Sequence, residues 1–333
     1  MNILKKLKLI IFKIIFFPRN SYRWVISRYN EFTSSVESFF HHFKIIREAN
    51  ITLGKYHMQQ GNHKEASLRF WLTDKLFAKN DSENLYWSAW NDILLKDYAK
   101  AIKKLENNDF DKINLKNYVQ NMSSVQTIPK EICEEFESLT QDYSYKRYIG
   151  EKNNLFDNFF SSLIPYIPKF EDKDKKFRML EIASSPELCA RVKEFLPKDS
   201  EIETVNFFED HTKLVESYNK DTSFYSSVKT IPRGDFSDFI QPHYNLIIAF
   251  DSISYTSKIG DIFKIFRNAL DSNGLLALVL PKAEFTKLDP SECRFNFSKN
   301  DIESKLKLAE FMPVSITTII LNKSNEYYLV LAK

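Results

Sequence analysis

Residues 179–187 read Met-Leu-Glu-Ile-Ala-Ser-Ser-Pro-Glu, and this stretch decides the fold of the second half of the chain. The apolar run that ends at Ile182 predicts a buried strand, and a turn of small residues then leads into a helix over 187–196. A strand that passes through a short turn into a helix is the repeating unit of a parallel α/β sheet. We therefore expect an α/β domain built around this junction.

The same alternation continues to the end of the sequence. Strands are predicted over 178–183, 201–207, 225–231, 244–250 and 275–280, and helices over 187–196, 213–218, 259–270 and 299–311. Two last apolar runs, 314–321 and 326–332, flank a turn-rich tetrapeptide and predict an antiparallel hairpin. The expected fold class is α/β, with a Rossmann-like, mostly parallel sheet, a terminal antiparallel hairpin and an all-α domain before it.

A repeat marks the first half of the chain. Three pairs of positions recur at an interval of 35 residues: Gly61 with Lys96, Ala66 with Ala101, and Phe70 with Leu105. Small residues at such intervals let paired helices cross closely, and the pattern resembles about two tetratricopeptide repeats. The TPR-like helical domain is assigned to residues 31–125. Its repeats form either a concave surface for a protein or peptide partner, or a helical cap on the second domain.

Residues 126–176 form a helical connector, with helices expected over 131–139 and 153–164 and a charged link at 171–176. The α/β domain then covers residues 177–333. Three cysteines stand far apart without zinc spacing, so a metal site is not expected and a reducing, cytoplasmic compartment fits best.

The first segment, residues 1–30, is basic and apolar. It carries seven Lys and Arg and no acid, so that the net charge of +3 leaves −4 for the remainder. Its apolar run is too short and too charged to span a bilayer, and no cleavage site follows it. Residues 1–20 are typical of a helix that lies at a membrane surface. The alternative is a helix that packs on the rest of the protein or frays. No nucleic-acid partner is expected, because the body lacks a basic surface.

The order of the elements in the second half resembles the class I S-adenosylmethionine-dependent methyltransferases. With the preceding repeats, the chain resembles bacterial predicted methyltransferases that carry N-terminal tetratricopeptide repeats, over about residues 50–333. The matching segments are 179–187, Gly234-Asp235-Phe236, 244–251 with its terminal Asp, 269–275, and 294–298 followed by 309–311.

The resemblance implies a cofactor site at the ends of the first four strands. Glu181 is the first-strand acid, and Ala183, Ser184 and Ser185 form the loop that is normally glycine-rich. Only six glycines occur in 333 residues, so this loop is degenerate. Further along, Asn206 stands where an acid usually binds the ribose hydroxyls, with Glu209 and Asp210 nearby as substitutes.

Three more residues complete the implied site. Asp235 would accept the adenine amino group, and Phe236 would lie against the adenine ring. Asp251 would face the substrate or cap the next helix, and the polar residues 252–256 favour the cap. His211 is a weak candidate base.

Two functions follow from these residues. One is methyl transfer from S-adenosylmethionine to a protein or small molecule, which needs alignment more than a catalytic acid or base. The other is a catalytically inactive pseudo-methyltransferase that serves as a scaffold or protein-interaction module through its repeats. The first is motivated by the ordered strands, and the second by the lost glycines and Asn206.

Overall fold

The structure is a computed structural model that describes residues 28–29, 44–77, 79–167, 176–183, 186–233, 235–236, 243–322 and 325–333. Apart from 28–29, the basic segment 1–30 lies outside the described residues, and so does its predicted membrane-surface helix. Within the described ranges, no helix is both long enough and apolar enough to cross a membrane.

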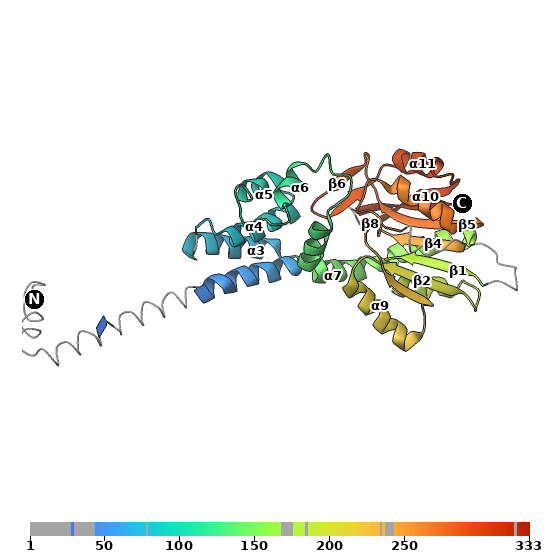
Figure 1. The fold of residues 1–333 in the computed structure, drawn as a ribbon, viewed down its shortest axis with the longest axis horizontal. Coiled ribbons are helices and arrows are strands. Elements are labelled where there is room, and N and C mark those ends of the chain that lie inside the picture. The colour runs from blue at the N-terminus through green and yellow to red at the C-terminus, as the bar shows by residue number, and fades with distance from the viewer. Residues whose placement is uncertain are drawn as a thin grey trace, which may run out of the picture.

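A seven-stranded sheet forms the centre of the second half, in the order β3-β2-β1-β4-β5-β9-β8 (Figure 1). The pairs among β1 to β5 are parallel, whereas β9 pairs antiparallel with both β5 and β8. The strand bounds are β1 Arg178–Ile182, β2 Glu201–Asn206, β3 Ser227–Thr230, β4 Tyr244–Phe250, β5 Leu270–Pro281, β8 Pro313–Asn322 and β9 Asn325–Ala332. The expected sheet of parallel strands with a terminal antiparallel hairpin is therefore present.

Alternating residues of each strand face opposite layers, because successive side chains in a strand point to opposite faces. One face is covered by α10 (Ile259–Ala269) and α11 (Lys299–Leu308), which bury Phe263, Phe266 and Leu306 against it. The other is covered by the end of α7 (Lys130–Leu163), α8 (Pro186–Lys193) and α9 (Glu209–Thr222). The central strands are buried on both faces, so their sequences are mostly apolar.

The predicted strands and helices of this domain agree with the structure to within a few residues at most ends. The largest difference is at β5, which begins at Leu270 rather than 275, with an irregular register against Tyr244. A two-stranded hairpin, β6 (Lys287–Asp289) with β7 (Arg294–Asn296), was not predicted, because three-residue strands carry no periodic signal.

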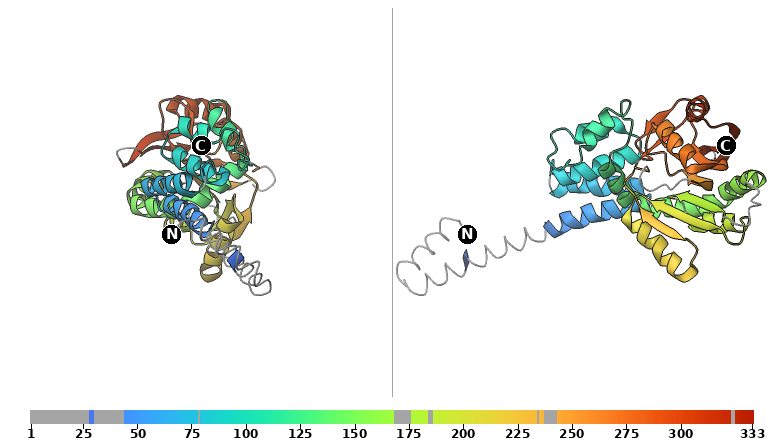
Figure 2. Two further views of the ribbon diagram at one scale, coloured as in Figure 1. Left: turned by 90° about the vertical axis from the view of Figure 1, so that its left-hand side faces the viewer. Right: turned by 45° about the vertical axis from the view of Figure 1, so that its right-hand side comes forward.

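Helical hairpins fill the first half. A helix over 44–59 pairs with α3 (His63–Leu72), which continues into the π-helical turn η1 (Thr73–Phe77). The second pair is α4 (Ser82–Leu94) with α5 (Tyr98–Lys104), and the short α6 (Leu115–Gln120) follows. Figures 1 and 2 show these helices grouped to one side of the sheet.

The 35-residue period is present in the backbone of the two hairpins. The N–H groups of Gly61 and Asn62 donate to Met58 and His57, and those of Lys96 and Asp97 donate to Ile93 and Asp92 in the same pattern. Gly61 and Lys96 both have positive φ, 73° and 64°. The repeat is therefore structural, although its membership of the tetratricopeptide class is a proposal.

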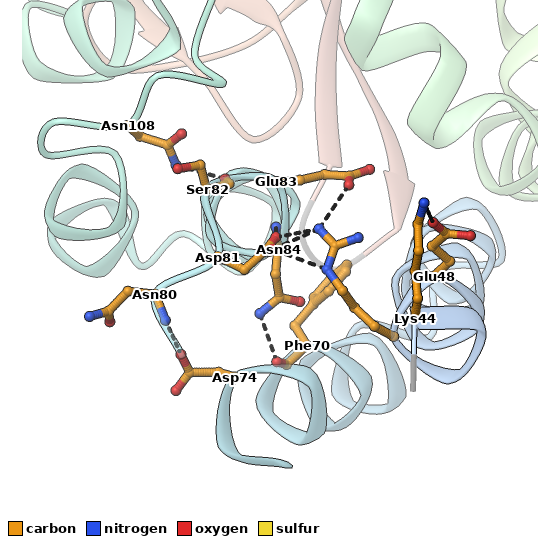
Figure 3. A network of polar contacts seen from close by, with 11 residues as sticks. Lys44, Glu48, Phe70, Asp74, Asn80, Asp81, Ser82, Glu83, Asn84 and Asn108 are labelled. Atoms are coloured by element: carbon orange, nitrogen blue, oxygen red, sulfur yellow. Dashed lines mark hydrogen bonds and ion pairs between the residues drawn. The ribbon is translucent and has the colours of Figure 1, made fainter. Parts of the chain in front are cut away.

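An ion pair joins the first hairpin to the second. The Arg47 guanidinium donates to both carboxylate oxygens of Asp81 at 2.7 Å, and Asp81 also caps α4 by accepting from the Asn84 N–H at 2.9 Å. The Asn84 side chain in turn donates to the Phe70 carbonyl at 3.0 Å (Figure 3). These polar contacts fix the register between the two hairpins.

The connector differs from the prediction. Instead of helices over 131–139 and 153–164, one 34-residue helix, α7, runs from Lys130 to Leu163. Directly before it, residues 126–128 pair with 255–257: Ile128 N–H donates to the Tyr255 carbonyl at 2.9 Å, and Ser257 N–H donates to Gln126 at 2.8 Å. We call this pairing the seam. One hydrophobic core runs across it, from the helical hairpins to the α10 face of the sheet.

We predict that Gly54→Ala destabilises the chain by about 1–3 kcal/mol, because a Cβ there would lie 2.5 Å from the buried Phe70 ring. The second hairpin has Ala89 and Leu105 at the positions 35 residues later. The double change Gly54→Ala with Phe70→Leu should therefore recover part of the loss. Urea unfolding of the single and double variants measures this coupling, and simple additivity would contradict the proposed equivalence.

Candidate functional site

The carboxyl ends of the parallel strands bring the predicted site residues to one edge of the sheet. β1 ends at Ile182 before Ala183, β2 ends at Asn206, and β4 ends at Phe250 before Asp251. β1 lies between β2 and β4, so these three ends are neighbours. Ligands of open α/β sheets bind at this edge, where connections leave toward both faces.

Ala183 takes the backbone conformation that a glycine would adopt here. Its φ is 47°, in the left-handed region, and its N–H donates to the Val205 carbonyl at 2.8 Å. That conformation costs a non-glycine residue roughly 1 kcal/mol or more. Ala183 thus keeps a glycine-type backbone conformation. Ser184 and Ser185 lie outside the described residues.

Asn206 is the last residue of β2. It is 2% exposed, and among the described residues its side-chain amide nitrogen has no hydrogen-bond partner. A buried donor of this kind is costly unless a partner accepts from it. Glu209 and Asp210 do not replace it, because their exposed side chains lie in the first turn of α9 near Lys213.

Glu181 is fully buried on the α9 side of the sheet. Its carboxyl oxygen accepts a hydrogen bond from the Tyr225 hydroxyl at 2.6 Å. Tyr225 precedes β3, 44 residues further along the chain, and no spacing in the sequence linked it to Glu181. This tyrosine fixes the acid beside the loop.

Asp235 and Phe236 lie in different surroundings. Asp235 is partly buried, and its N–H donates to the Pro232 carbonyl in a turn at 3.0 Å. The Phe236 ring is fully buried, 5.7 Å from Phe207 and 5.5 Å from Phe266 between ring centroids. Phe236 thus has the position of a core residue, whereas Asp235 stays partly accessible to a ligand.

Arg233 is a site residue that the sequence did not indicate. Its guanidinium lies 4.8 Å from the Tyr255 ring, 5.0 Å from Phe208 and 5.8 Å from Phe207. Cations are attracted to aromatic faces at such distances. Glu137 of α7 approaches it to 3.9 Å, and burial raises the pKa of Glu137 to about 7. Residues from four separate segments, and from both halves of the chain, therefore gather at the edge.

Asp251 does not cap the next helix, so that expectation was wrong. α10 begins after Lys258, and Asp251 instead accepts from the Arg294 guanidinium at 2.7 Å and from the Ser254 hydroxyl at 2.8 Å. Arg294 also donates to the Tyr327 hydroxyl at 2.8 Å. Burial raises the pKa of the Asp251 carboxyl, even though Arg294 opposes this. Asp251 therefore forms an ion pair with Arg294 of the β6–β7 hairpin, and the sequence did not predict this hairpin.

His211 lies on the exposed side of α9, with its ring 5.8 Å from Phe208. In the described part of the chain, no three His, Cys, Asp or Glu side chains are grouped closely enough to hold a metal ion.

No protein-family model matches the chain, and no curated protein sequence matches it. Solved structures do match its fold. A 1,6-didemethyltoxoflavin-N1-methyltransferase from Burkholderia thailandensis is 12% identical with a TM-score of 0.45, covering 63% of this chain and 91% of that one. An S-adenosylmethionine-dependent methyltransferase from Clostridium acetobutylicum is 15% identical with a TM-score of 0.40, covering 61% and 97%.

The glycopeptide N-methyltransferase MtfA, complexed with sinefungin, is 12% identical with a TM-score of 0.40, covering 54% of this chain and 85% of that one. At such identities the likeness concerns the fold alone. The sheet order and its antiparallel edge define a Rossmann-like α/β protein.

We predict that Arg294→Met destabilises the chain by about 3–5 kcal/mol, because it leaves the buried Asp251 carboxylate without its cation. The double change Asp251→Asn with Arg294→Met should recover much of this loss. Lys282→Met serves as the control, since its more exposed ion pair with Glu326 contributes about 0–1 kcal/mol. Equal urea midpoints for Arg294→Met and Lys282→Met would contradict the prediction.

Proposed function

We propose that this chain is an S-adenosylmethionine-dependent methyltransferase-like protein that transfers a methyl group to a protein or small molecule. One observation carries the proposal. The sheet order β3-β2-β1-β4-β5-β9-β8 brings Glu181, Ala183 and Asn206 together at one edge. These are the positions where the resembling family holds its cofactor.

The residues at this edge fit the cofactor in part. The unpartnered amide nitrogen of Asn206 can donate to a ribose hydroxyl, and the partly buried Asp235 can accept from an adenine amino group. Ala183, directly after β1, has the left-handed backbone that glycine favours where a ligand approaches closely. An amide in place of the usual carboxylate loses a charge-assisted hydrogen bond, at a cost of about 1 kcal/mol.

The bound cofactor would supply an electrophilic methyl group on a sulfonium. This chain would then contribute alignment and exclusion of water, which suffice for a good nucleophile. Asp251 is held by Arg294 and Ser254, so it contributes a fixed end to β4 rather than a free base.

A second candidate, an inactive scaffold, is favoured by Arg233. Its guanidinium stacks on Phe207, Phe208 and Tyr255 at the same edge, so the chain's own side chains cover aromatic surface there. In this alternative the helical hairpins carry the function by binding a protein or peptide partner.

We expect S-adenosylhomocysteine to bind with Asn206→Asp about fivefold tighter than wild type, since the carboxylate restores roughly 1 kcal/mol of hydrogen bonding. Asp235→Ala should weaken binding by a similar factor. Calorimetry measures both, and thermal stability checks them, because ligand at 100 times its dissociation constant adds about 2.7 kcal/mol. Asn268→Asp, on the exposed face of α10, is the control for added charge.

The two candidates give opposite results in this experiment. Binding that follows the order Asn206→Asp, wild type, Asp235→Ala supports the cofactor site. No heat and no stabilisation at millimolar ligand, in wild type and in Asn206→Asp alike, would leave only the scaffold function.

We also propose that residues 1–20 contact an anionic membrane surface, on the basis of their lysines and apolar residues alone. The full chain should float with anionic liposomes at low salt, and a chain that begins at residue 21 should not. Equal flotation of the two chains would contradict the proposed anchor.

A further inference from the structure

Two cysteines from distant parts of the chain meet beside the seam. Cys133 lies in the first turn of α7, and Cys293 lies directly before β7, 160 residues later. Their sulfur atoms are 3.8 Å apart, with the Cys293 thiol donating to the Cys133 sulfur. No short spacing connects the two residues, so the sequence did not suggest the pair.

The loop after β4 holds both cysteines in place. Residues 126–128 pair with this loop immediately before α7 begins, and the Phe295 N–H donates to the Ser254 carbonyl at 2.6 Å, two residues after Cys293. Both cysteines thus lie close to backbone segments that are hydrogen-bonded to the loop after β4. A disulfide has a sulfur–sulfur distance of about 2.05 Å. Bond formation requires the sulfurs to approach from 3.8 Å by about 1.8 Å.

The surroundings of the pair favour thiol chemistry. The hydrogen bond from Cys293 and the nearby Arg233 guanidinium lower the pKa of the Cys133 thiol, although burial opposes them. The thiolate is the reactive form of cysteine. Cys133 is buried, but it contacts the partly exposed Cys293, so a small oxidant would reach the pair from the Cys293 side. Its φ of 47° is a conformation that a non-glycine residue keeps only where the surroundings enforce it.

We propose that Cys133 and Cys293 form a reversible disulfide that joins α7 to the β6–β7 hairpin beside the seam. The oxidant is a peroxide. The Cys133 thiolate attacks a peroxide oxygen, the O–O bond breaks, and a sulfenic acid forms with loss of hydroxide. The Cys293 thiol then attacks that sulfur, the S–O bond breaks, and water leaves with the Cys293 proton. In total, two thiols lose two hydrogen atoms, and hydrogen peroxide is reduced to two waters.

The bond ties the helical half to the carboxyl edge of the sheet. It closes a long loop of the unfolded chain, and such cross-links stabilise the native state by restricting the unfolded one. Oxidation therefore adds a covalent link beside the seam, between α7 and the β6–β7 hairpin. The inference does not depend on cofactor binding.

The test uses the full reduced chain, treated at neutral pH with one molar equivalent of hydrogen peroxide. The intact mass should fall by two hydrogen atoms, and a non-reducing peptide map should contain one cross-link between Cys133 and Cys293. Excess dithiothreitol should reverse both. The melting temperature of the oxidised chain should exceed that of the reduced chain by several degrees.

Three variants and one condition serve as controls. Cys189→Ser should keep the cross-link and the rise in melting temperature, whereas Cys133→Ser and Cys293→Ser should lose both. The same oxidation in denaturing urea should produce a mixture of pairings that includes Cys189.

The proposal is overturned if the native chain keeps all three thiols after oxidation. It is also overturned if Cys189 takes part in native cross-links as often as it does in urea. The wild-type peptide map decides this even where a serine variant does not fold.

Discussion

The pairing of residues 126–128 with 255–257 is the contact on which the rest of the architecture depends. Through Ile128, Tyr255 and Ser257 it joins the helical half directly to the carboxyl end of β4. Backbone groups that pair with one another leave no buried donor or acceptor, so a continuous apolar core can cross the contact. The helical hairpins and the sheet therefore share one hydrophobic core. The seam connects the hairpins to the sheet edge where a ligand would bind.

The same contact shapes the chemistry at that edge. Three residues meet there: Glu137 belongs to α7, Arg233 to the segment after β3, and Tyr255 to the loop after β4. The cation of Arg233 contacts aromatic rings and lies near the Glu137 carboxylate, but its Nε and Nη1 have no hydrogen-bond partner among the described residues. Asn206 and Ala183 each keep a feature that a ligand would complete: an unpartnered amide nitrogen and a left-handed backbone conformation. Arg233 favours the scaffold proposal, whereas Asn206 and Ala183 favour the proposal of a cofactor site.

Much of the fold was predictable because its signals are local. β4 was predicted over 244–250 and is observed over Tyr244–Phe250. A short, largely apolar run bounded by polar residues predicts a buried strand of a parallel sheet. The two hairpins were predictable from a 35-residue period, which small residues at helix crossings impose. The single α7 and the β6–β7 hairpin were missed. Long polar stretches of helix and three-residue strands are decided by what packs on them.

At the candidate site, the sequence by itself determined that Glu181, Ala183, Asn206 and Asp251 lie at or near the ends of three strands, because strand ends are local features. Only the tertiary structure decided what each of these residues does. Tyr225 holds Glu181, Arg294 holds Asp251, and Arg233 lies on aromatic rings from two other segments. Tyr225 lies 44 residues from Glu181 along the chain, and Arg294 lies 43 residues from Asp251. Side chains so far apart in the chain leave no periodic pattern, and they meet only when the sheet orders its strands and the seam closes over its edge.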